Sequence, residues 1–401
     1  LFRGVAFNLT IQDIKTGRGI YMKLFHISDL HLGKKVYEFS MLTDQTYALS
    51  QICDLAETHQ PDGILISGDI YDKSIPPIEA VQLLDQFLTR LQKIGIPIYM
   101  ISGNHDSATR LDFGSRILEK QNIYLCGAFD GTLHHISQND AYGEIRFYLL
   151  PFLKPAMLLP FLEEDTHLSY AQAIQWVLTH TDLDTTKRNI LLAHQFVTWK
   201  DTAEESDSER KTLGGVDEID ASLFFDFDYV ALGHLHSPQR IGKDTIRYGG
   251  SLLRYSFSEI NQKKGVTIID IQEKGNISIE FVPLQPLHNM REIRGPLESL
   301  LQAASEEGGS TDYVRAMLTD SGIVLDPVTK LRQYYPNLMC VERITERNEI
   351  NSTYETENIP ETLNGQALFA AFFEKQQGHA LTEEQNTLLM QIWQKIGGDG
   401  E

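Results

Sequence analysis

The stretch at residues 97–106, PIYMISGNHD, decides the fold because it joins an apolar strand directly to a row of polar side chains. An apolar run with β-branched residues at 98–101 is typical of a strand buried inside a sheet. The run ends abruptly at Gly103, and Asn104, His105 and Asp106 follow. The stretch therefore predicts an interior strand that delivers chemically active side chains to the loop after it.

Four other apolar runs follow the same plan. Each ends in a short loop that carries Asp or His: KLFHIS-DLH (23–31), GILIS-GD (63–69), NILLA-H (189–194) and YVAL-GHLH (229–236). Because the carboxyl ends of neighbouring parallel strands meet at one edge of a sheet, we expect these side chains to form one site. The candidates are Asp29, His31, Asp69, Asn104, His194, His234 and His236.

Length and composition describe an ordinary globular protein of more than one domain. The chain has 401 residues, of which 42% are hydrophobic and 9% aromatic, enough for a substantial core. Three cysteines form no CxxC pair, which predicts reduced thiols in a cytoplasmic protein rather than a disulfide or zinc framework. No apolar run approaches the roughly 20 residues that span a bilayer, so we expect no membrane contact. The net charge of −20 argues against bulk electrostatic wrapping of nucleic acid but allows a site where bound cations invert the local field.

The chain predicts an α/β fold in four segments. Residues 1–21 fit no later pattern and are either an extension before Met22 or a flexible N-terminus. At 22–283, strands alternate with helices near 43–59, 77–94 and 110–120, and shorter strands then follow from 122 to 282. This order predicts a largely parallel sheet, a second sheet packed on it, and flanking helices, an α/β/β/α sandwich. Residues 284–345 predict a small α+β domain, and 346–401 a polar linker with two amphipathic C-terminal helices.

The candidate side chains suit a pair of divalent metal ions. If Asp69 bridges two ions, each ion has four protein ligands. His, Asp and Asn donors without thiolate favour Mn²⁺ first, then Fe, Co or Zn. Two such ions, about 3.5–4 Å apart, are the standard device for splitting phosphoesters, because they activate water and neutralise charge on the reacting oxygens.

Two residues beside Asn104 are predicted to be catalytic. His105 is placed to stabilise the pentavalent phosphorus or to protonate the leaving oxygen, and Asp106 to fix the tautomer and orientation of His105. Lys34 and Lys35 either contact phosphate or lie on a solvated turn.

Each motif also has a structural interpretation. A lone Asp-x-His or Gly-Asp is more often a loop with a capping Asp, and only the five motifs in order, each after an apolar strand, favour a site. The other eight histidines lack this context and are expected on the surface or in packing. The apolar stripes of the two C-terminal helices are typical of core packing, although the acidic tail, with ten acids and three bases at 346–401, also suits protein docking.

The motifs DLHLGK, GDIYD, GNHD, His194 and GHLH, in this order, resemble the calcineurin-like metallophosphoesterase superfamily over residues 22–282. The longer stretches GDIYDKSIPP, SERKTLGGVDEIDASLF, DYVALGHLH and YGGSLLRYSFSE are similar to the SbcD family, the nuclease subunits of bacterial SbcC–SbcD complexes. This resemblance implies a two-metal, Mn²⁺-dependent DNA nuclease for repair, recombination and replication. Its expected activities are 3′→5′ exonuclease on duplex ends and endonuclease on single strands and hairpins.

The resemblance also implies roles for individual residues. One metal falls on Asp29, His31, Asp69 and His236, the second on Asp69, Asn104, His194 and His234, and His105 is the catalytic histidine. Archaeal and eukaryotic relatives often have a histidine three residues after the bridging Asp. Here that position is Asp72, so the role of that histidine is absent or reassigned.

Partners follow from the same resemblance. The family works with an SbcC-like ATPase that has a long coiled coil, and this chain has no G-x-x-x-x-G-K-[ST] motif, so ATP dependence would come from the partner. Residues 285–345 would cap the DNA, 361–397 would dock on the coiled coil, and helices near 77–94 and 110–120 would form a homodimer within a heterotetramer. Two alternatives stay open: a phosphoesterase for a small-molecule or phosphoprotein substrate, and a non-catalytic scaffold.

Overall fold

The computed structural model describes residues 21–162, 167–200, 203–209, 217–322, 324–344, 369, 373 and 380–396. Residues 1–20, the predicted linker at 346–360 and most of the first predicted C-terminal helix, with Leu368 and Phe372, lie outside the described residues. The described chain divides into two compact units. The first contains the residues up to Glu292 with Ser310–Arg315 and Tyr335–Cys340, and the second contains the remainder. The domain boundaries expected at 283/284 and 345/346 stay predictions.

The first sheet of the larger unit has the strand order β16-β15-β1-β4-β5-β6. Its four strands β1, β4, β5 and β6 are parallel, and β15 and β16 continue the sheet antiparallel beyond β1. Every residue of β4 and β5 is buried, which explains their unbroken apolar sequences. The strands are β1 Met22–Ile27, β4 Gly63–Ser67, β5 Ile98–Ile101, β6 Ile123–Cys126, β15 Gly265–Ile271 and β16 Ile277–Pro283.

The second sheet has the order β13-β14-β12-β9-β8-β7. Its inner strands β14, β12, β9 and β8 are parallel, and the edge strands β7 and β13 pair antiparallel. The strands are β7 His135–Asp140, β8 Gly143–Leu150, β9 Arg188–His194, β12 Tyr229–Gly233, β13 Gln239–Ile241 and β14 Lys243–Tyr248. Smaller pairs are β2 Lys35–Val36 with β3 Phe39–Ser40, and β10 Val197–Thr198 with β11 Ile219–Asp220.

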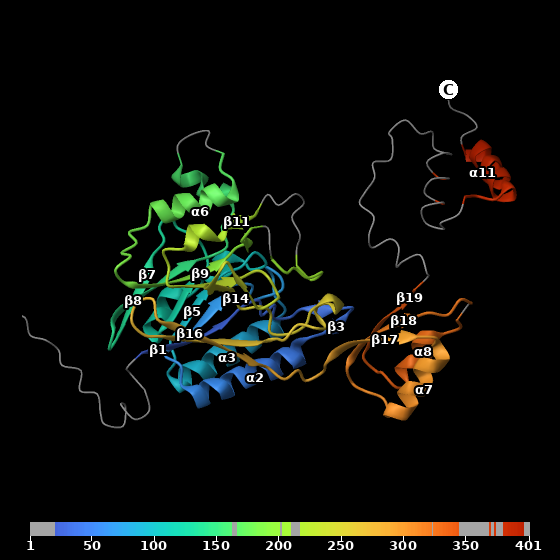
Figure 1. Ribbon diagram of the computed structural model, residues 1–401, viewed down its shortest axis with the longest axis horizontal. Helices are drawn as coiled ribbons and strands as arrows, with labels where there is room; N and C mark the ends of the chain where they lie inside the picture. Colours follow the sequence, from blue (N-terminus) through green and yellow to red (C-terminus); the bar gives the residue numbers. More distant parts are fainter. Residues whose placement is uncertain are drawn as a thin grey trace, which may run out of the picture. The chain divides into compact units, whose positions relative to one another are not determined.

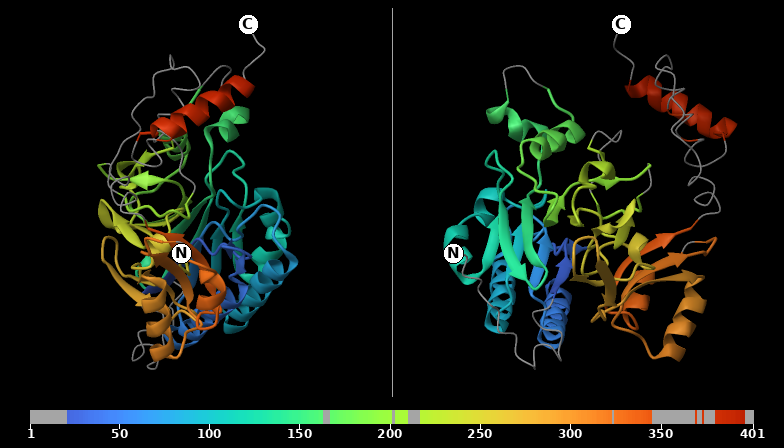
Figure 2. Two further views of the ribbon diagram at one scale, coloured as in Figure 1. Left: turned by 90° about the vertical axis from the view of Figure 1, so that its right-hand side faces the viewer. Right: turned by 60° about the vertical axis from the view of Figure 1, so that its left-hand side comes forward.

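Three apolar cores hold the layers together. One lies between the two sheets and includes Leu65, Tyr99, Phe147 and Leu192. A second joins the first sheet to helices α2 (Leu42–His59) and α3 (Ile78–Ile94), which cover its outer face in Figure 1. The third joins the second sheet to α6 (Tyr170–Thr179), on the opposite side of the sandwich in Figure 2. The expected α/β/β/α sandwich is confirmed.

The main helices begin and end at sequence signals. Pro77 precedes α3, and Gly95 ends it in the left-handed conformation with φ of 85°. The hydroxyl of Ser169 and the side chain of Gln172 form a reciprocal capping box at the start of α6. The shorter helices are α4 Ala108–Leu111, α5 Ser115–Leu118, η1 Glu119–Gln121, η2 Pro155–Phe161, η3 Ala221–Phe224 and η4 Phe257–Glu259.

Two expectations about the core were wrong, and one helix was not predicted. A continuous helix near 110–120 is replaced by α4, α5 and η1, because Gly114 has a φ of 79° and breaks the helix. The strands after residue 122 do not all belong to the second sheet, since β6, β15 and β16 join the first. Helix α6 was missed.

The second unit contains helix α7 (Leu297–Glu307), which packs against α8 (Pro327–Arg332) through buried Leu300, Ala304 and Leu331. Asp326 caps α8 by accepting a hydrogen bond from the backbone N–H of Thr329. Strands β17 Met290–Gly295, β18 Tyr313–Leu318 and β19 Leu338–Arg343 form a three-stranded sheet in chain order. The second C-terminal helix is confirmed as α11 (Glu383–Ile396).

The cysteines Cys53, Cys126 and Cys340 are all free thiols, as predicted. Within the described ranges, no helix combines the length and the apolar character that crossing a membrane would require.

Candidate metal centre

The predicted ligands meet where strands of both sheets end. Asp29, Asp69 and Asn104 follow β1, β4 and β5 of the first sheet, whereas His194 ends β9 of the second sheet and His234 follows β12. The sequence predicted one edge of one sheet. The structure instead places the site across the ends of the two packed sheets, so that residues far apart in the chain lie close together in space.

One group of side chains gathers around the amide oxygen of Asn104. His194 Nε2 and His234 Nδ1 each lie 3.0 Å from Asn104 Oδ1, and His194 Nε2 lies 3.4 Å from Asp69 Oδ2. The Nδ1 atom of His194 is 2.8 Å from the carbonyl oxygen of Ser67, which can only accept a hydrogen bond. His194 therefore keeps its Nδ1 proton and turns Nε2 toward Asp69 and Asn104.

A second group gathers around His31. The Nε2 atoms of His31 and His236 are 3.1 Å apart, and His31 Nε2 lies 3.7 Å from Asp69 Oδ2. Asp29 belongs to both groups, since its carboxylate lies with His31 and His236 on one side and with Asp69 and His194 on the other. In each of these sets of three residues, the ligand atoms lie within 4.8 Å of one another.

The backbone of the site is held in an uncommon conformation. Asp29, His31, Asp69 and His234 all have positive φ, at 52°, 44°, 48° and 112°. Residues other than glycine rarely adopt a positive φ, and such backbone strain concentrates at functional sites. Gly103 lets the loops approach, because a Cβ there would lie 2.1 Å from Asp69 Oδ1.

Burial and proximity change the pKa values of these groups. Burial raises the pKa of Asp29 to about 7, and burial, with the nearby His194, lowers that of His234 to about 3. Although burial opposes it, the carboxylates of Asp69 and Asp29 raise the pKa of His194 to about 9. The site thus concentrates carboxylates and imidazoles away from water, where their charges need compensation.

This donor set fits divalent cations. Two imidazole Nε2 atoms that face each other at 3.1 Å compete for one proton unless a cation lies between their lone pairs. His31 Nδ1 is also buried without a hydrogen-bond partner. Imidazole, carboxylate and amide donors without thiolate match Mn, Fe, Co or Zn better than Ca.

The predicted catalytic histidine lies at the edge of these two groups of side chains. His105 donates its backbone N–H to Asp69 Oδ1 (2.9 Å), and its Nε2 lies 4.0 Å from Asp69 Oδ2. Its Nδ1 lies 2.8 Å from the backbone carbonyl of Asp72. The expectation that Asp106 orients this ring was wrong, since Asp72 supplies the partner.

Asp106 instead ties two loops together. Its carboxylate accepts backbone N–H bonds from Gly103 (2.8 Å), Tyr71 (2.9 Å) and Ile70 (3.0 Å). Burial, followed by the charge of Asp69, raises its pKa to about 7. Asp106 therefore holds the β4 loop against the β5 loop.

Lys34 and Lys35 differ in their burial and contacts. Lys34 Nζ lies 2.8 Å from Asp72 Oδ1, and its side chain is only 14% exposed, so it is a fixed cation beside the site rather than part of a solvated turn. Lys35 is exposed.

Two residues that support His31 were missed from the sequence. Gln45 on α2 donates from Nε2 to the carbonyl of His31 (2.8 Å) and to the hydroxyl of Tyr255 (3.0 Å). Tyr255 in turn donates to the carbonyl of Leu30 (2.7 Å), and its ring contacts those of His31 and His236. The apolar spacing of helix 43–59 did not mark Gln45, and only the structure shows that its side chain is fully buried.

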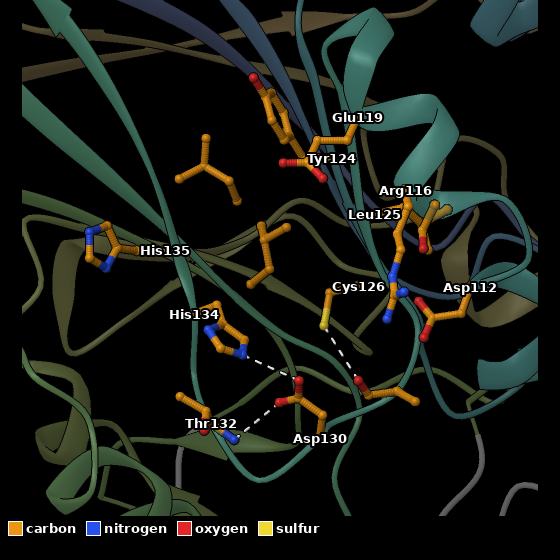
Figure 3. Close-up of a pocket in the computed structure, with 14 residues that line it drawn as sticks. Asp112, Arg116, Glu119, Tyr124, Leu125, Cys126, Asp130, Thr132, His134 and His135 are labelled. Atoms are coloured by element: carbon orange, nitrogen blue, oxygen red, sulfur yellow. Dashed lines mark hydrogen bonds and ion pairs between the residues drawn. The ribbon is translucent and has the colours of Figure 1, made fainter.

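A separate pocket of about 470 Å³ lies beside β6 and β7 (Figure 3). Arg116, Cys126 and His134 line it, and His134 pairs with Asp130 at 3.2 Å. None of the predicted site residues lines this pocket.

Comparison with known proteins places these features in a family. Residues 22–238 match the calcineurin-like phosphoesterase family, and 286–377 match the family described as type 5 capsule protein repressor C-terminal domain. The SbcD subunit of the nuclease SbcCD from Staphylococcus epidermidis is 37% identical over 80% of this chain and 86% of its own length. The protein of the same name from Staphylococcus saprophyticus is 35% identical over 94% of this chain and 100% of its own. A dimetal phosphatase from Danio rerio aligns at 12% identity with a TM-score of 0.39, covering 66% of this chain and 96% of the phosphatase.

Proposed function

The chain belongs to the SbcD family of calcineurin-like phosphoesterases, and from that membership we propose that it is a two-metal DNA nuclease. It hydrolyses phosphodiesters, as a 3′→5′ exonuclease on duplex ends and as an endonuclease on single-stranded and hairpin DNA. It acts in the cytoplasm, in DNA repair, recombination and replication. The exonuclease and endonuclease activities come from the family resemblance.

One observation carries the proposal: Asp69 Oδ2 lies 3.4 Å from His194 Nε2 and 3.7 Å from His31 Nε2, between the two groups of ligands. Asp69 is therefore placed to bridge two ions. One ion would be held by Asp29, His31, Asp69 and His236, and the other by Asp69, Asn104, His194 and His234. We propose Mn²⁺ for both, because the donor set lacks thiolate.

The metals and the protein have separate tasks. When bound, two divalent cations would supply an activated water and neutralise charge on the phosphate oxygens. His105 holds its Nδ1 proton on the carbonyl of Asp72, so Nε2 is free to give a proton to the leaving oxygen or to contact a phosphate oxygen. The ammonium group of Lys34, fixed by Asp72, adds a positive charge where the incoming backbone is negative.

The proposed partner is an SbcC-like ATPase with a coiled coil. The Staphylococcus relatives are named as subunits of the nuclease SbcCD, and this name, with the match to the C-terminal family at 286–377, supports the proposal. The apolar positions of the C-terminal helices, including Leu388, which is 57% exposed on α11, would dock on that coiled coil. Residues 284–345 would cap the DNA.

We also propose that two copies form a homodimer. Ile78 at the start of α3 is 73% exposed, and Phe113 next to α4 is 88% exposed. A hydrogen bond from Arg110 to the carbonyl of Ser74 joins the segments that precede α3 and form α4. Large apolar side chains exposed on neighbouring segments are typical of a protein interface.

An assay with end-labelled duplex and hairpin DNA, in Mn²⁺ and in Mg²⁺, tests the proposal. We expect nucleotides to be released from the 3′ end and the hairpin to be cleaved, both faster in Mn²⁺. A parallel panel of a phosphomonoester, a lipid pyrophosphate and a phosphopeptide tests the alternative of a small-molecule or phosphoprotein substrate. Rapid turnover of any of these with intact DNA would contradict the nuclease, and no hydrolysis at all would support a scaffold.

A further inference from the structure

His236 is held at its backbone and at its ring by three other residues. Its N–H donates to Glu209 Oε1 at 2.5 Å, and its carbonyl accepts from Lys264 Nζ at 2.9 Å. Its Nδ1 lies 2.6 Å from Ser208 Oγ. The side chain is only 2% exposed, so water does not compete with these contacts.

The hydroxyl of Ser208 determines which nitrogen of the ring carries the proton. Ser208 donates its one hydroxyl proton to Glu259 Oε1, so its oxygen is left to accept from His236 Nδ1. Glu259 Oε1 lies 3.4 Å from the same Nδ1 and is also an acceptor. Both neighbours of Nδ1 therefore favour the tautomer with the proton on Nδ1 and the lone pair on Nε2, which faces His31.

Lys264 fixes Glu259 in this position. Its Nζ lies 2.7 Å from Glu259 Oε2, and the two side chains are 6% and 0% exposed. Lys264 Nζ also lies 2.9 Å from Ser251 Oγ and 2.8 Å from Gln262 Oε1, so its three N–H donors are shared among four acceptors, counting the carbonyl of His236. A buried ion pair with its hydrogen bonds satisfied holds a single geometry.

The support comes from parts of the sequence outside the phosphoesterase motifs. Ser208 opens the SERKTLGG stretch, and Glu259 closes YGGSLLRYSFSE. We propose that Ser208, Glu259 and Lys264 are positioning residues that hold His236 in its Nδ1–H form and thereby set the affinity of one of the two metal sites. The inference rests on the proposed metal centre, and the partners of a ligating histidine typically change metal affinity by about 10–100-fold.

Manganese titration of the full chain by calorimetry tests the proposal, with Ser208→Ala, Ser208→Thr and Glu259→Gln. We expect Ser208→Ala and Glu259→Gln to weaken one of two sites by about 10-fold or more and to spare the other, and Ser208→Thr to restore binding. Asp140→Asn is the matched control, because it breaks another buried ion pair, with Arg188 at the opposite end of β9 from His194. Unchanged manganese binding in Ser208→Ala and Glu259→Gln, or an equal loss of affinity at both metal sites, would overturn the proposal. If Glu259→Gln fails to fold, the two Ser208 variants decide.

The tautomer can be measured without metal. Nitrogen-15 spectra of the histidine-labelled, metal-free chain, with His236 assigned from His236→Gln, should show the proton on Nδ1 in the wild type. We expect Ser208→Ala to populate the Nε2–H form, and an identical tautomer in both chains would overturn the positioning role. A wild-type chain that binds no manganese but shows the expected tautomer shift would contradict the proposed function and leave the role of Ser208 intact.

Discussion

The Nδ1 atom of His105 lies 2.8 Å from the backbone carbonyl oxygen of Asp72. A carbonyl oxygen only accepts hydrogen bonds, so Nδ1 carries a proton and Nε2 is the ring nitrogen left for other contacts. That nitrogen faces Asp69 Oδ2 at 4.0 Å. His105 is thus oriented by a backbone carbonyl, and this carbonyl is retained whichever side chain residue 72 carries.

Replacing His105 should separate binding from cleavage. We expect His105→Ala to keep metal and DNA binding and to lose about 10²–10⁴-fold in cleavage rate, because a proton donor is lost while the ligands stay. Calorimetry with Mn²⁺, anisotropy with a phosphorothioate duplex, and single-turnover cleavage measure the three properties. Unchanged cleavage would remove His105 from the mechanism.

Replacing Asp106 should act on stability before chemistry. Asp106→Ala leaves the backbone N–H groups of Ile70, Tyr71 and Gly103 without their acceptor, which we expect to cost about 3 kcal/mol. Urea unfolding measures this loss. Asp112→Ala is a matched control, since Asp112 accepts a single backbone bond, from Gly127, and its loss should cost about a third as much. A fall in cleavage at unchanged stability would instead support a catalytic role for Asp106.

The convergence of the candidate ligands could be predicted because each of them depends on a local pattern. Asp29, Asp69 and His194 each follow an apolar run that is buried on both faces, and the polar residue at its end is visible without knowing the fold. The pairing of the strands depends on distant residues. β15 pairs with β1 across more than two hundred positions, and nothing within residues 265–271 distinguishes an edge of the first sheet from part of the second.

The surroundings of the ligands could not be predicted for the same reason. Gln45 is one of many polar residues on an amphipathic helix, and only the fold places it against His31 and Tyr255. The partner of His105 is a backbone carbonyl, which leaves no mark in the sequence at all. Helix α6 is different, because Ser169 and Gln172 are a readable capping box that was overlooked.

Metal removal should lower stability through Asp69. Chelation with EDTA should reduce the melting temperature of the wild type. Addition of Mn²⁺ at 100 times its dissociation constant should raise the free energy of unfolding by about 2.7 kcal/mol per site. Asp69→Asn should lose most of this gain, because the proposed bridging carboxylate contributes to both sites. Differential scanning calorimetry with and without Mn²⁺ gives the comparison. An equal metal-induced gain in the variant would contradict the bridging position.

Removing the tail should separate activity from assembly. Deletion of 361–401 should spare the proposed Mn²⁺-dependent nuclease activity of the isolated chain, since none of the proposed ligands lies there. It should abolish binding to the proposed SbcC-like ATPase in a pull-down with purified partner. Retained binding would put the docking surface elsewhere on the chain.

His26 should make the fold sensitive to acid. This histidine is fully buried, with Nδ1 3.0 Å from the hydroxyl of Tyr229 and Nε2 3.2 Å from the carbonyl of Leu232, and burial lowers its pKa from 6.5 to about 3. Between these values the unfolded chain binds a proton that the folded chain excludes. The contribution of His26 to the free energy of unfolding is therefore fully present above pH 6.5. It falls as the pH drops toward 3, by up to about 1.4 kcal/mol per pH unit.

The contribution of His26 can be isolated by substitution. In urea unfolding at pH 7.5, 6.5, 5.5 and 4.5 with EDTA present, His26→Gln should be less stable than the wild type at pH 7.5 and should lose stability less steeply below pH 6.5. The buried histidines of the proposed metal centre are the same in both chains, so the difference in slope belongs to His26. His134→Gln changes an exposed histidine and should keep the wild-type slope. If His26→Gln and the wild type show the same slope of unfolding free energy against pH, another group causes the acid sensitivity. The burial and hydrogen bonds of His26 then do not hold its ring neutral.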